Sequence, residues 1–275
     1  MTTPDILFTL EDSSVKAQVR GLVDMDRTRQ GSDRSRFIRH FRIDSPPGSS
    51  SYPFCLPVVK HLYETGGFSL RGGLTFLVGE NGSGKSTLLE ALAVAAGMNA
   101  EGGSQNYRFA TRSSESSLSQ YLSLAWGMEK PRSRFFLRAE TYYNVATETE
   151  RLGHAQIAAL GGVSPHLRSH GESFVDLMAH RFHAGGLYFM DEPEAALSPH
   201  ACLGVIARLA DLVEHQRCQV LVATHSPMLL AVPGAQICEI HDDGSIVDTS
   251  YNDASPVRLT KDFLSDPDRY LRHLI

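Results

Sequence analysis

The stretch LTFLVGENGSGKST, from Leu74 to Thr87, decides how this chain can fold. Its mostly apolar start is typical of a short buried strand, and a glycine-rich turn follows directly. The next residues, STLLEALAVAAG, have the apolar spacing of a helix that ends at Gly97. A strand, a tight glycine turn and a helix in this order predict one unit of a parallel α/β sheet.

The turn matches the pattern G-x-x-x-x-G-K-[ST], in which backbone N–H groups surround phosphate oxygens and glycines permit the close approach. The N-terminus of the following helix adds partial positive charge. Lys85 would neutralise the β- and γ-phosphates, and the Ser86 hydroxyl would bind Mg²⁺. The pattern also occurs by chance, but here a predicted strand and helix flank it. We therefore expect ATP and Mg²⁺ to bind at Gly79, Glu80, Asn81, Gly82, Ser83, Gly84, Lys85, Ser86 and Thr87.

A second apolar segment, LYFM at 187–190, predicts a strand that runs into Asp191 and Glu192. Ligands of parallel α/β sheets bind at the carboxyl ends of the strands. Asp191 would hold Mg²⁺, and Glu192 would polarise the attacking water as general base. An isolated Asp-Glu pair is commonly a solvated turn, but its place after a buried strand and downstream of a phosphate loop favours the catalytic interpretation.

The segment QVLVAT at 219–224 predicts a further parallel strand, and His225 follows it. A histidine at a strand end is more often structural, but beside a γ-phosphate it would sense and orient that group. An amphipathic helix is predicted between the two strands, and strand–helix–strand order indicates a parallel sheet with helices on its faces. The apolar face of this helix is predicted to contain Leu203, Ile206, Leu209 and Val213.

Other segments give a coarser outline. The run RFIRHFRI at 36–43 alternates like a strand, SSLSQYLSLAWG at 116–127 is interpreted as a helix, and RFFLRAE at 134–140 is an apolar run ending at Glu140. DPDRYLRHLI predicts a C-terminal helix with Asp266 as its cap and Pro267 at its first position. We expect an N-terminal extension at 1–35 and one domain at 36–275, with an insert at about 98–184.

Composition limits the classes of function. The 275 residues are 42% hydrophobic and 21% charged, which fits one α/β domain with decorations or at most two small domains. A net charge of −5 excludes a chain-wide electrostatic nucleic-acid binder, while the arginines between positions 27 and 42 fit either a local nucleic-acid contact or a solvated segment. The widely spaced cysteines and the lack of a long apolar stretch predict a cytoplasmic protein without disulfides or membrane insertion.

Taken in order, GENGSGKST, SHGES, LYFMDEPEAALSP and ATHSP resemble the ABC-type ATPase superfamily, in the branch that includes SMC and RecF-like repair ATPases. Small stand-alone bacterial proteins labelled AAA family ATPase resemble the chain most, over roughly residues 36–275. The resemblance implies a P-loop NTPase fold with a mostly parallel central sheet flanked by helices, a small antiparallel β lobe and a helical insertion. It also implies a homodimer that forms head-to-head around Mg-ATP.

The resemblance also implies roles for three further segments. Ser169, Gly171 and Glu172 stand where the signature sequence S-G-G-Q is expected, and they would contact the ATP of the partner subunit. Ser169 with Glu172 is equally a capping box, and the two interpretations are compatible because a capped helix can still present its first turn to phosphate. Glu140 stands where the glutamine loop is expected to bind the metal, or is a surface glutamate. The loop Ala195–Ser198 would reach the partner subunit.

Three hypotheses follow. The first is an ATPase that acts as a nucleotide-dependent switch, in which ATP binding drives dimerisation and hydrolysis releases it. The second is the nucleotide-binding subunit of a transporter, which predicts a standard signature and a clear glutamine loop that this sequence lacks. The third is a nucleotide-dependent scaffold in repair or defence, against which the intact Asp191, Glu192 and His225 argue. The sequence leaves a nucleic acid or a protein as the downstream partner.

Overall fold

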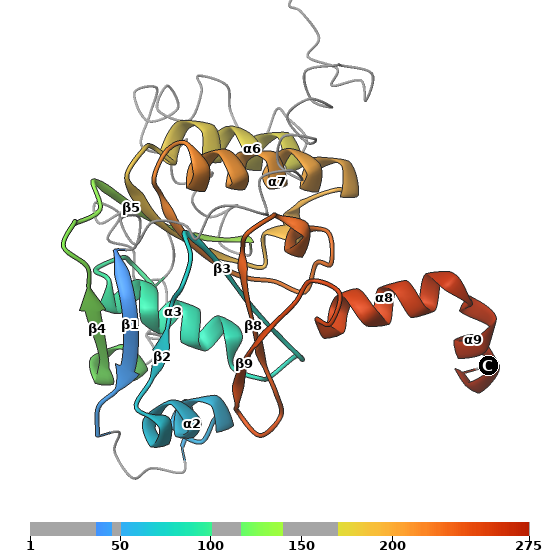
Figure 1. The fold of residues 1–275 in the computed structure, drawn as a ribbon, viewed down its shortest axis with the longest axis horizontal. Helices are drawn as coiled ribbons and strands as arrows, with labels where there is room; N and C mark the ends of the chain where they lie inside the picture. Colours follow the sequence, from blue (N-terminus) through green and yellow to red (C-terminus); the bar gives the residue numbers. More distant parts are fainter. Residues whose placement is uncertain (1–36, 46–50, 101–116, 140–169, 275) are drawn as a thin grey trace, which may run out of the picture. The chain divides into compact units, whose positions relative to one another are not determined.

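Six strands in the order β5-β6-β7-β3-β8-β9 make the main sheet of the computed structural model (Figure 1). The structure describes residues 37–45, 51–100, 117–139 and 170–274. The chain divides into two units, Met1–Asp33 and Arg34–Ile275, and every described residue belongs to the second. The division at residue 36 predicted from the sequence stays a prediction, and most of the predicted insert lies outside the described residues.

All neighbouring strands of the main sheet run parallel except β9, which pairs antiparallel with β8. β3 lies between β7 and β8, so the glycine loop that follows it leaves the sheet next to the end of β7. The predicted strands at 74–78, 187–190 and 219–224 are all present, and the mostly parallel α/β sheet is confirmed. The apolar run that begins at Arg134 lies in a further strand. The strands are β3 (Leu74–Gly79), β5 (Ser133–Arg138), β6 (Gly186–Asp191), β7 (Gln219–Ala223), β8 (Gln236–Ile240) and β9 (Ile246–Thr249).

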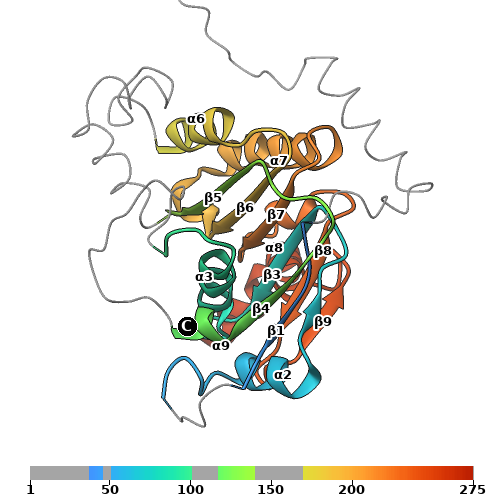
Figure 2. The ribbon, with the colours of Figure 1, turned by 90° about the vertical axis from the view of Figure 1, so that its left-hand side faces the viewer.

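Helices and a second, smaller sheet cover the two faces of the main sheet (Figures 1 and 2). Alternate residues of β6 enter different cores, because successive side chains of a strand point to opposite faces. Tyr188 and Met190 pack in the cluster that contains α6 and α7 side chains, whereas Leu187 and Phe189 pack in the cluster that contains those of α3. β6 is therefore buried on both faces, which holds the residues that follow it in one position. The helices named here are α3 (Lys85–Ala95), α6 (His170–Arg181) and α7 (Pro199–Glu214).

The apolar face predicted for the helix at 200–215 is partly wrong. Leu209 is fully buried as expected, but Leu203 is 44% exposed. Cys202 and Val205 pack against the sheet instead, because the helix is rotated about its axis relative to the predicted face. Spacing alone gave the correct helix but not the correct rotation, and a shift of one residue changes the direction of a side chain by about 100°.

A three-stranded antiparallel sheet in the order β2-β1-β4 forms the lobe predicted by the resemblance. The helix predicted at 116–127 is wrong in its second half, because a 3-10 turn at Ser117–Tyr121 gives way to β4, which pairs with β1. The buried side chain of Gln219 joins this sheet to β7, since its Oε1 accepts the N–H groups of Phe37 and Ile38, each at 2.8 Å. The strands are β1 (Ile38–Ile43), β2 (Phe68–Ser69) and β4 (Leu122–Trp126).

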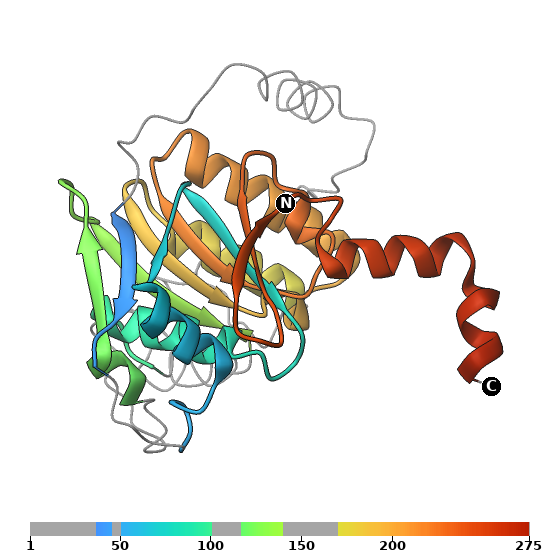
Figure 3. The same cartoon turned by 60° about the horizontal axis from the view of Figure 1, so that its bottom comes forward.

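The C-terminal residues form two helices that extend from β9 (Figure 3). Ala254 and Val257 are buried in the core and anchor the first of them. Leu259 and Leu264, further along, are 58% and 70% exposed. The predicted C-terminal helix and its cap are confirmed, because the N–H of Arg269 donates to Asp266 Oδ1 at 3.2 Å. The remaining elements are α2 (Pro57–Thr65), η5 (Pro193–Ala196), η6 (Leu229–Ala231), α8 (Ser255–Ser265) and α9 (Pro267–Leu274).

Candidate active site

The glycine loop occupies the turn between β3 and α3. Gly82 and Gly84 have φ angles of 85° and 95°, in the left-handed region that favours glycine. A Cβ on Gly84 would also come within 2.8 Å of Val58 Cγ1. Ser83 Oγ is buried in this loop with no hydrogen-bond partner among the described residues. A tight loop with positive-φ glycines and a buried hydroxyl that has no partner among the described residues fits the binding of phosphate oxygens.

Lys85 lies inside this loop and is only 4% exposed. Its Nζ donates to the carbonyl oxygens of Gly79 and Glu80, both at 2.9 Å. Burial lowers the pKa of the amine, and the carboxylates of Glu192, Asp191, Glu80 and Glu194 oppose that shift. The ammonium group is therefore held beside the loop and near the acids that follow β6, where a bound polyphosphate would take over its contacts.

Asp191 ends β6 and is 6% exposed. In the sheet it stands opposite Ala223 of β7 and Arg138 of β5. Arg138 Nε lies 3.5 Å from Asp191 Oδ2, and Arg138 Nη1 lies 2.8 Å from Glu90 Oε2 on α3. Arg138 was not predicted as a site residue from the sequence, although a charged residue near the end of an apolar run is a signal that could have found it.

Glu192 and His225 face one another across the ends of β6 and β7. Glu192 has a left-handed backbone with φ 47° and ψ 52°, and its N–H donates to the carbonyl of Ala223 at 2.9 Å. A non-glycine residue in this region costs about 1–3 kcal/mol, and such residues cluster at functional sites. Glu192 Oε1 lies 3.7 Å from His225 Nε2, and both side chains are partly exposed. The predicted general base and the predicted sensor are thus neighbours.

The chemistry of these side chains fits a magnesium–nucleotide complex. Among the described residues no group of three or more His, Cys, Asp or Glu could hold a metal ion by itself. Mg²⁺ in phosphate-transfer sites is usually bound by one or two protein oxygens together with substrate phosphates and water. Asp191 and Ser86 are the residues that would supply those protein oxygens.

The remaining predicted site residues fall partly or wholly outside this part of the structure. Ser169 and Glu140 lie outside the described residues. Gly171 and Glu172 lie in the first turn of α6, as the predicted helix requires. Their contact with a partner's nucleotide stays a prediction.

Tyr52 is a further residue beside the loop that was not predicted from the sequence. Its hydroxyl makes a 2.6 Å hydrogen bond with the hydroxyl of Thr87, the last residue of the predicted phosphate site. The ring is 65% exposed. Its isolated position in a Pro/Gly/Ser-rich loop gave no pattern from which this contact could be predicted.

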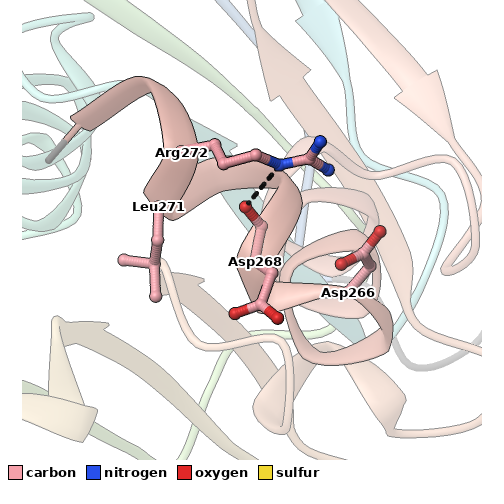
Figure 4. A pocket seen from close by; sticks show the side chains of 4 residues that line it. All are labelled: Asp266, Asp268, Leu271 and Arg272. Atoms are coloured by element: carbon pink, nitrogen blue, oxygen red, sulfur yellow. Dashed lines mark hydrogen bonds between the residues drawn. The ribbon is translucent and has the colours of Figure 1, made fainter.

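A shallow pocket lies at the junction of α8 and α9, and the residues of the candidate site do not line it (Figure 4). It is lined by Asp266, Asp268, Leu271 and Arg272. Arg272 Nε donates to the backbone carbonyl of Asp268 at 3.4 Å. None of the predicted site residues contributes to it.

A buried lysine in a strand–glycine loop–helix unit, together with two acids at the carboxyl end of another parallel strand of the same sheet, defines a P-loop ATPase nucleotide-binding domain. The family described as "AAA domain, putative AbiEii toxin, Type IV TA system" matches residues 74–145 and 160–231, which is more than half of the chain. The chain belongs to this family. Both matched segments contain predicted site residues, the first from Gly79 and the second up to His225.

Two solved structures are similar to the chain. One is described as "An inward-facing conformation of a putative metal-chelate type ABC transporter", with 19% identity, a TM-score of 0.41, and coverage of 68% of this chain and 75% of that one. The other is an SMC head domain from Thermotoga maritima, with 15% identity, a TM-score of 0.39, and coverage of 67% and 93%. A search of curated proteins found no match. No helix in the described ranges is long and apolar enough to span a membrane.

Proposed function

We propose that this chain binds Mg-ATP and hydrolyses it to ADP and phosphate. The observation that carries the proposal is the convergence of Lys85, Asp191, Glu192 and His225 at the carboxyl ends of three adjacent strands. Burial of the lysine and the opposing carboxylates around it are both expected of a phosphate site before substrate arrives.

Each of these side chains would have a separate role in the reaction. Lys85 would exchange its bonds to the Gly79 and Glu80 carbonyls for bonds to the β- and γ-phosphates. Ser86 and Asp191 would hold Mg²⁺, which supplies charge neutralisation at the phosphates. Glu192 Oε1 would accept the proton of the attacking water. His225, 3.7 Å from that carboxylate, would donate to the γ-phosphate and orient it.

The test of hydrolysis is the release of phosphate from ATP by the full chain, with Mg²⁺ and with EDTA. We expect turnover that requires Mg²⁺ and that Lys85→Ala abolishes. Turnover equal in the wild type and in Lys85→Ala would contradict the proposal and favour the scaffold hypothesis, in which nucleotide is bound but not cleaved.

We further propose that two ATP-bound chains associate head-to-head and that hydrolysis separates them. The support is the order of the loop at 79–87, the segment at 169–172 and the acids at 191–192, which in the resembling ATPases form one composite site across a two-fold axis. The downstream target, a nucleic acid or a protein, would respond to this change of state.

Light scattering, which measures the mass of the protein in solution, tests whether the dimer forms. Glu192→Gln with Mg-ATP should have twice the mass of the nucleotide-free protein, because binding is intact and the release step is blocked. Glu192→Gln that stays a monomer at saturating Mg-ATP would contradict dimerisation while leaving the proposed hydrolysis intact. Co-purification with a membrane permease would instead favour the transporter hypothesis.

A further inference from the structure

The carboxylate of Glu194 connects the segment that follows β6 with the start of the loop that follows β7. These two segments carry Glu192 and His225. Glu194 lies in η5, the short 3-10 helix that follows Glu192. Its Oε1 accepts two hydrogen bonds, from Thr224 Oγ1 at 2.7 Å and from the backbone N–H of His225 at 2.6 Å. Bonds to a carboxylate are stronger than bonds between neutral groups, so one oxygen fixes the start of the loop after β7.

The residues on both sides of this contact are themselves held in place. Thr224 is fully buried, and its Oγ1 also accepts the N–H of Ser226 at 3.0 Å. On the other side, the N–H of Leu197 donates to the carbonyl of Glu194 at 3.0 Å, and Ala196 and Leu197 pack against the core. The hydrogen bond from the His225 N–H to Glu194 Oε1 therefore connects η5 directly to the backbone of His225.

The loop Ala195–Ser198 begins inside η5 and ends at Ser198, the N-cap of α7, whose Oγ accepts the N–H of Ala201. This is the loop that the resemblance brings to the partner subunit. Glu194 is the residue of this segment whose side chain hydrogen-bonds to the residues around His225. Its second oxygen, Oε2, is buried with no hydrogen-bond partner among the described residues, so the carboxylate has no other bond that holds it.

We propose that Glu194 is a positioning residue that holds His225 opposite Glu192 and transmits the position of the Ala195–Ser198 loop to it. The inference rests on the proposed ATP hydrolysis, because it assigns to Glu194 the task of making that reaction respond to the partner subunit. Glu194 does not contact the reacting atoms. It acts by setting where the His225 imidazole, whose Nε2 has no hydrogen-bond partner in the described part of the chain, is directed.

Two substitutions separate the hydrogen bonds from the charge. Glu194→Gln retains an oxygen that can accept both bonds but removes the negative charge, whereas Glu194→Ala removes both. Small displacements of catalytic groups can reduce a rate about 100-fold. We expect Glu194→Ala to lower kcat about 10- to 100-fold with KM within about twofold, and Glu194→Gln to restore most of kcat. Glu214→Ala, an exposed glutamate at the end of α7, is the matched control and should have no effect.

A double-mutant cycle with His225→Ala gives the second readout. If Glu194 acts through His225, the double variant should be no slower than His225→Ala alone. Multiplicative losses in the double variant, or Glu194→Gln as slow as Glu194→Ala, would overturn the proposal. Thermal unfolding and Mg-ATP binding of each variant show whether a loss reflects misfolding.

A measurement without nucleotide keeps this proposal separate from the proposed function. The Cε1–H NMR signal of His225, assigned by its loss in His225→Ala, should shift in Glu194→Ala and stay in place in Glu194→Gln. An unchanged signal in Glu194→Ala would overturn the positioning role even if ATP is hydrolysed. A shifted signal in a protein that fails to hydrolyse ATP would retain the positioning role and overturn the proposed function alone.

Discussion

The glycine loop and the acid–histidine edge are two halves of one candidate site, and they differ in how their polar groups are satisfied. In the loop, Lys85 is buried and bonded to two carbonyls of its own turn. At the edge, Glu192 and His225 are partly exposed and 3.7 Å apart, a distance too long for a strong hydrogen bond. Under the proposed function, the loop would already have the shape that binds phosphate, whereas Glu192 and His225 would move closer together when substrate binds.

Under the proposed function, ATP binding and ATP hydrolysis should therefore be separable by substitution. The loop is made from consecutive residues whose geometry is fixed by one strand and one helix. The acid–histidine edge combines residues from the ends of β6 and β7. Asp191 and His225 are 34 positions apart in the sequence, and the parallel pairing of the two strands brings them close together. Substitutions in the loop should therefore weaken binding, and substitutions at the edge should slow turnover while ATP still binds.

The largest expected effect is that of Glu192→Gln on turnover. A positioned general base contributes about 100- to 10,000-fold to a rate, and the amide cannot accept the proton of water. We expect kcat to fall by about that factor in a phosphate-release assay. A reduction below about tenfold would contradict the role of Glu192 as the base.

Lys85→Ala should weaken the binding of Mg-ATP. Hydrogen bonds to charged groups contribute about 1.5–3 kcal/mol, which corresponds to about 10- to 100-fold in affinity. Isothermal titration calorimetry measures the affinity for Mg-ATP directly. Lys60→Ala, an exposed lysine of α2, is the control. If Lys85→Ala and Lys60→Ala bind Mg-ATP with equal affinity, Lys85 does not contact the phosphates.

Arg138→Met should change both the affinity for Mg²⁺ and the free energy of unfolding, because Arg138 lies beside Asp191 and Glu90. Removing a positive charge from beside the Asp191 carboxylate should raise the affinity for Mg²⁺ about fivefold, while the free energy of unfolding falls by about 1 kcal/mol. A magnesium titration of nucleotide binding and urea unfolding measure the two effects. Arg217→Met removes an exposed pair with Glu129 and should change neither. Unchanged magnesium affinity in Arg138→Met would show that Asp191 does not bind the metal.

The smallest expected effect is that of Tyr52→Phe, which removes the hydroxyl bonded to Thr87 and leaves the ring. A neutral hydrogen bond contributes about 1 kcal/mol, so Mg-ATP affinity should fall about two- to fivefold. Tyr63→Phe, a half-exposed tyrosine of α2, provides the comparison. Equal affinities of the two variants would mean that Tyr52 has no part in shaping the loop.

The sequence predicted those features that depend on neighbouring residues. β3, the glycine loop and α3 follow from the pattern between Leu74 and Gly97, because each step is set by local spacing and by glycine. The buried strand β6 and the acids after it were predicted for the same reason. The mostly parallel sheet followed from the alternation of strands and helices along the chain.

The predictions that failed depend on residues distant in sequence. The apolar spacing of SSLSQYLSLAWG suits a helix, but pairing with β1 makes its second half a strand. Arg138 and Glu194 were missed because their importance comes from contacts with Asp191 and with Thr224 and His225, which only the folded sheet brings together. Local pattern cannot report such contacts.

Equilibrium binding of Mg-ATP to Lys85→Ala and Glu192→Gln, measured side by side, tests the central claim most directly. We expect Glu192→Gln to bind Mg-ATP at least as tightly as the wild type, whereas Lys85→Ala should bind it about 10- to 100-fold more weakly. Equal loss in both variants, or full binding in both, would contradict the division of this site into a binding half and a hydrolysis half.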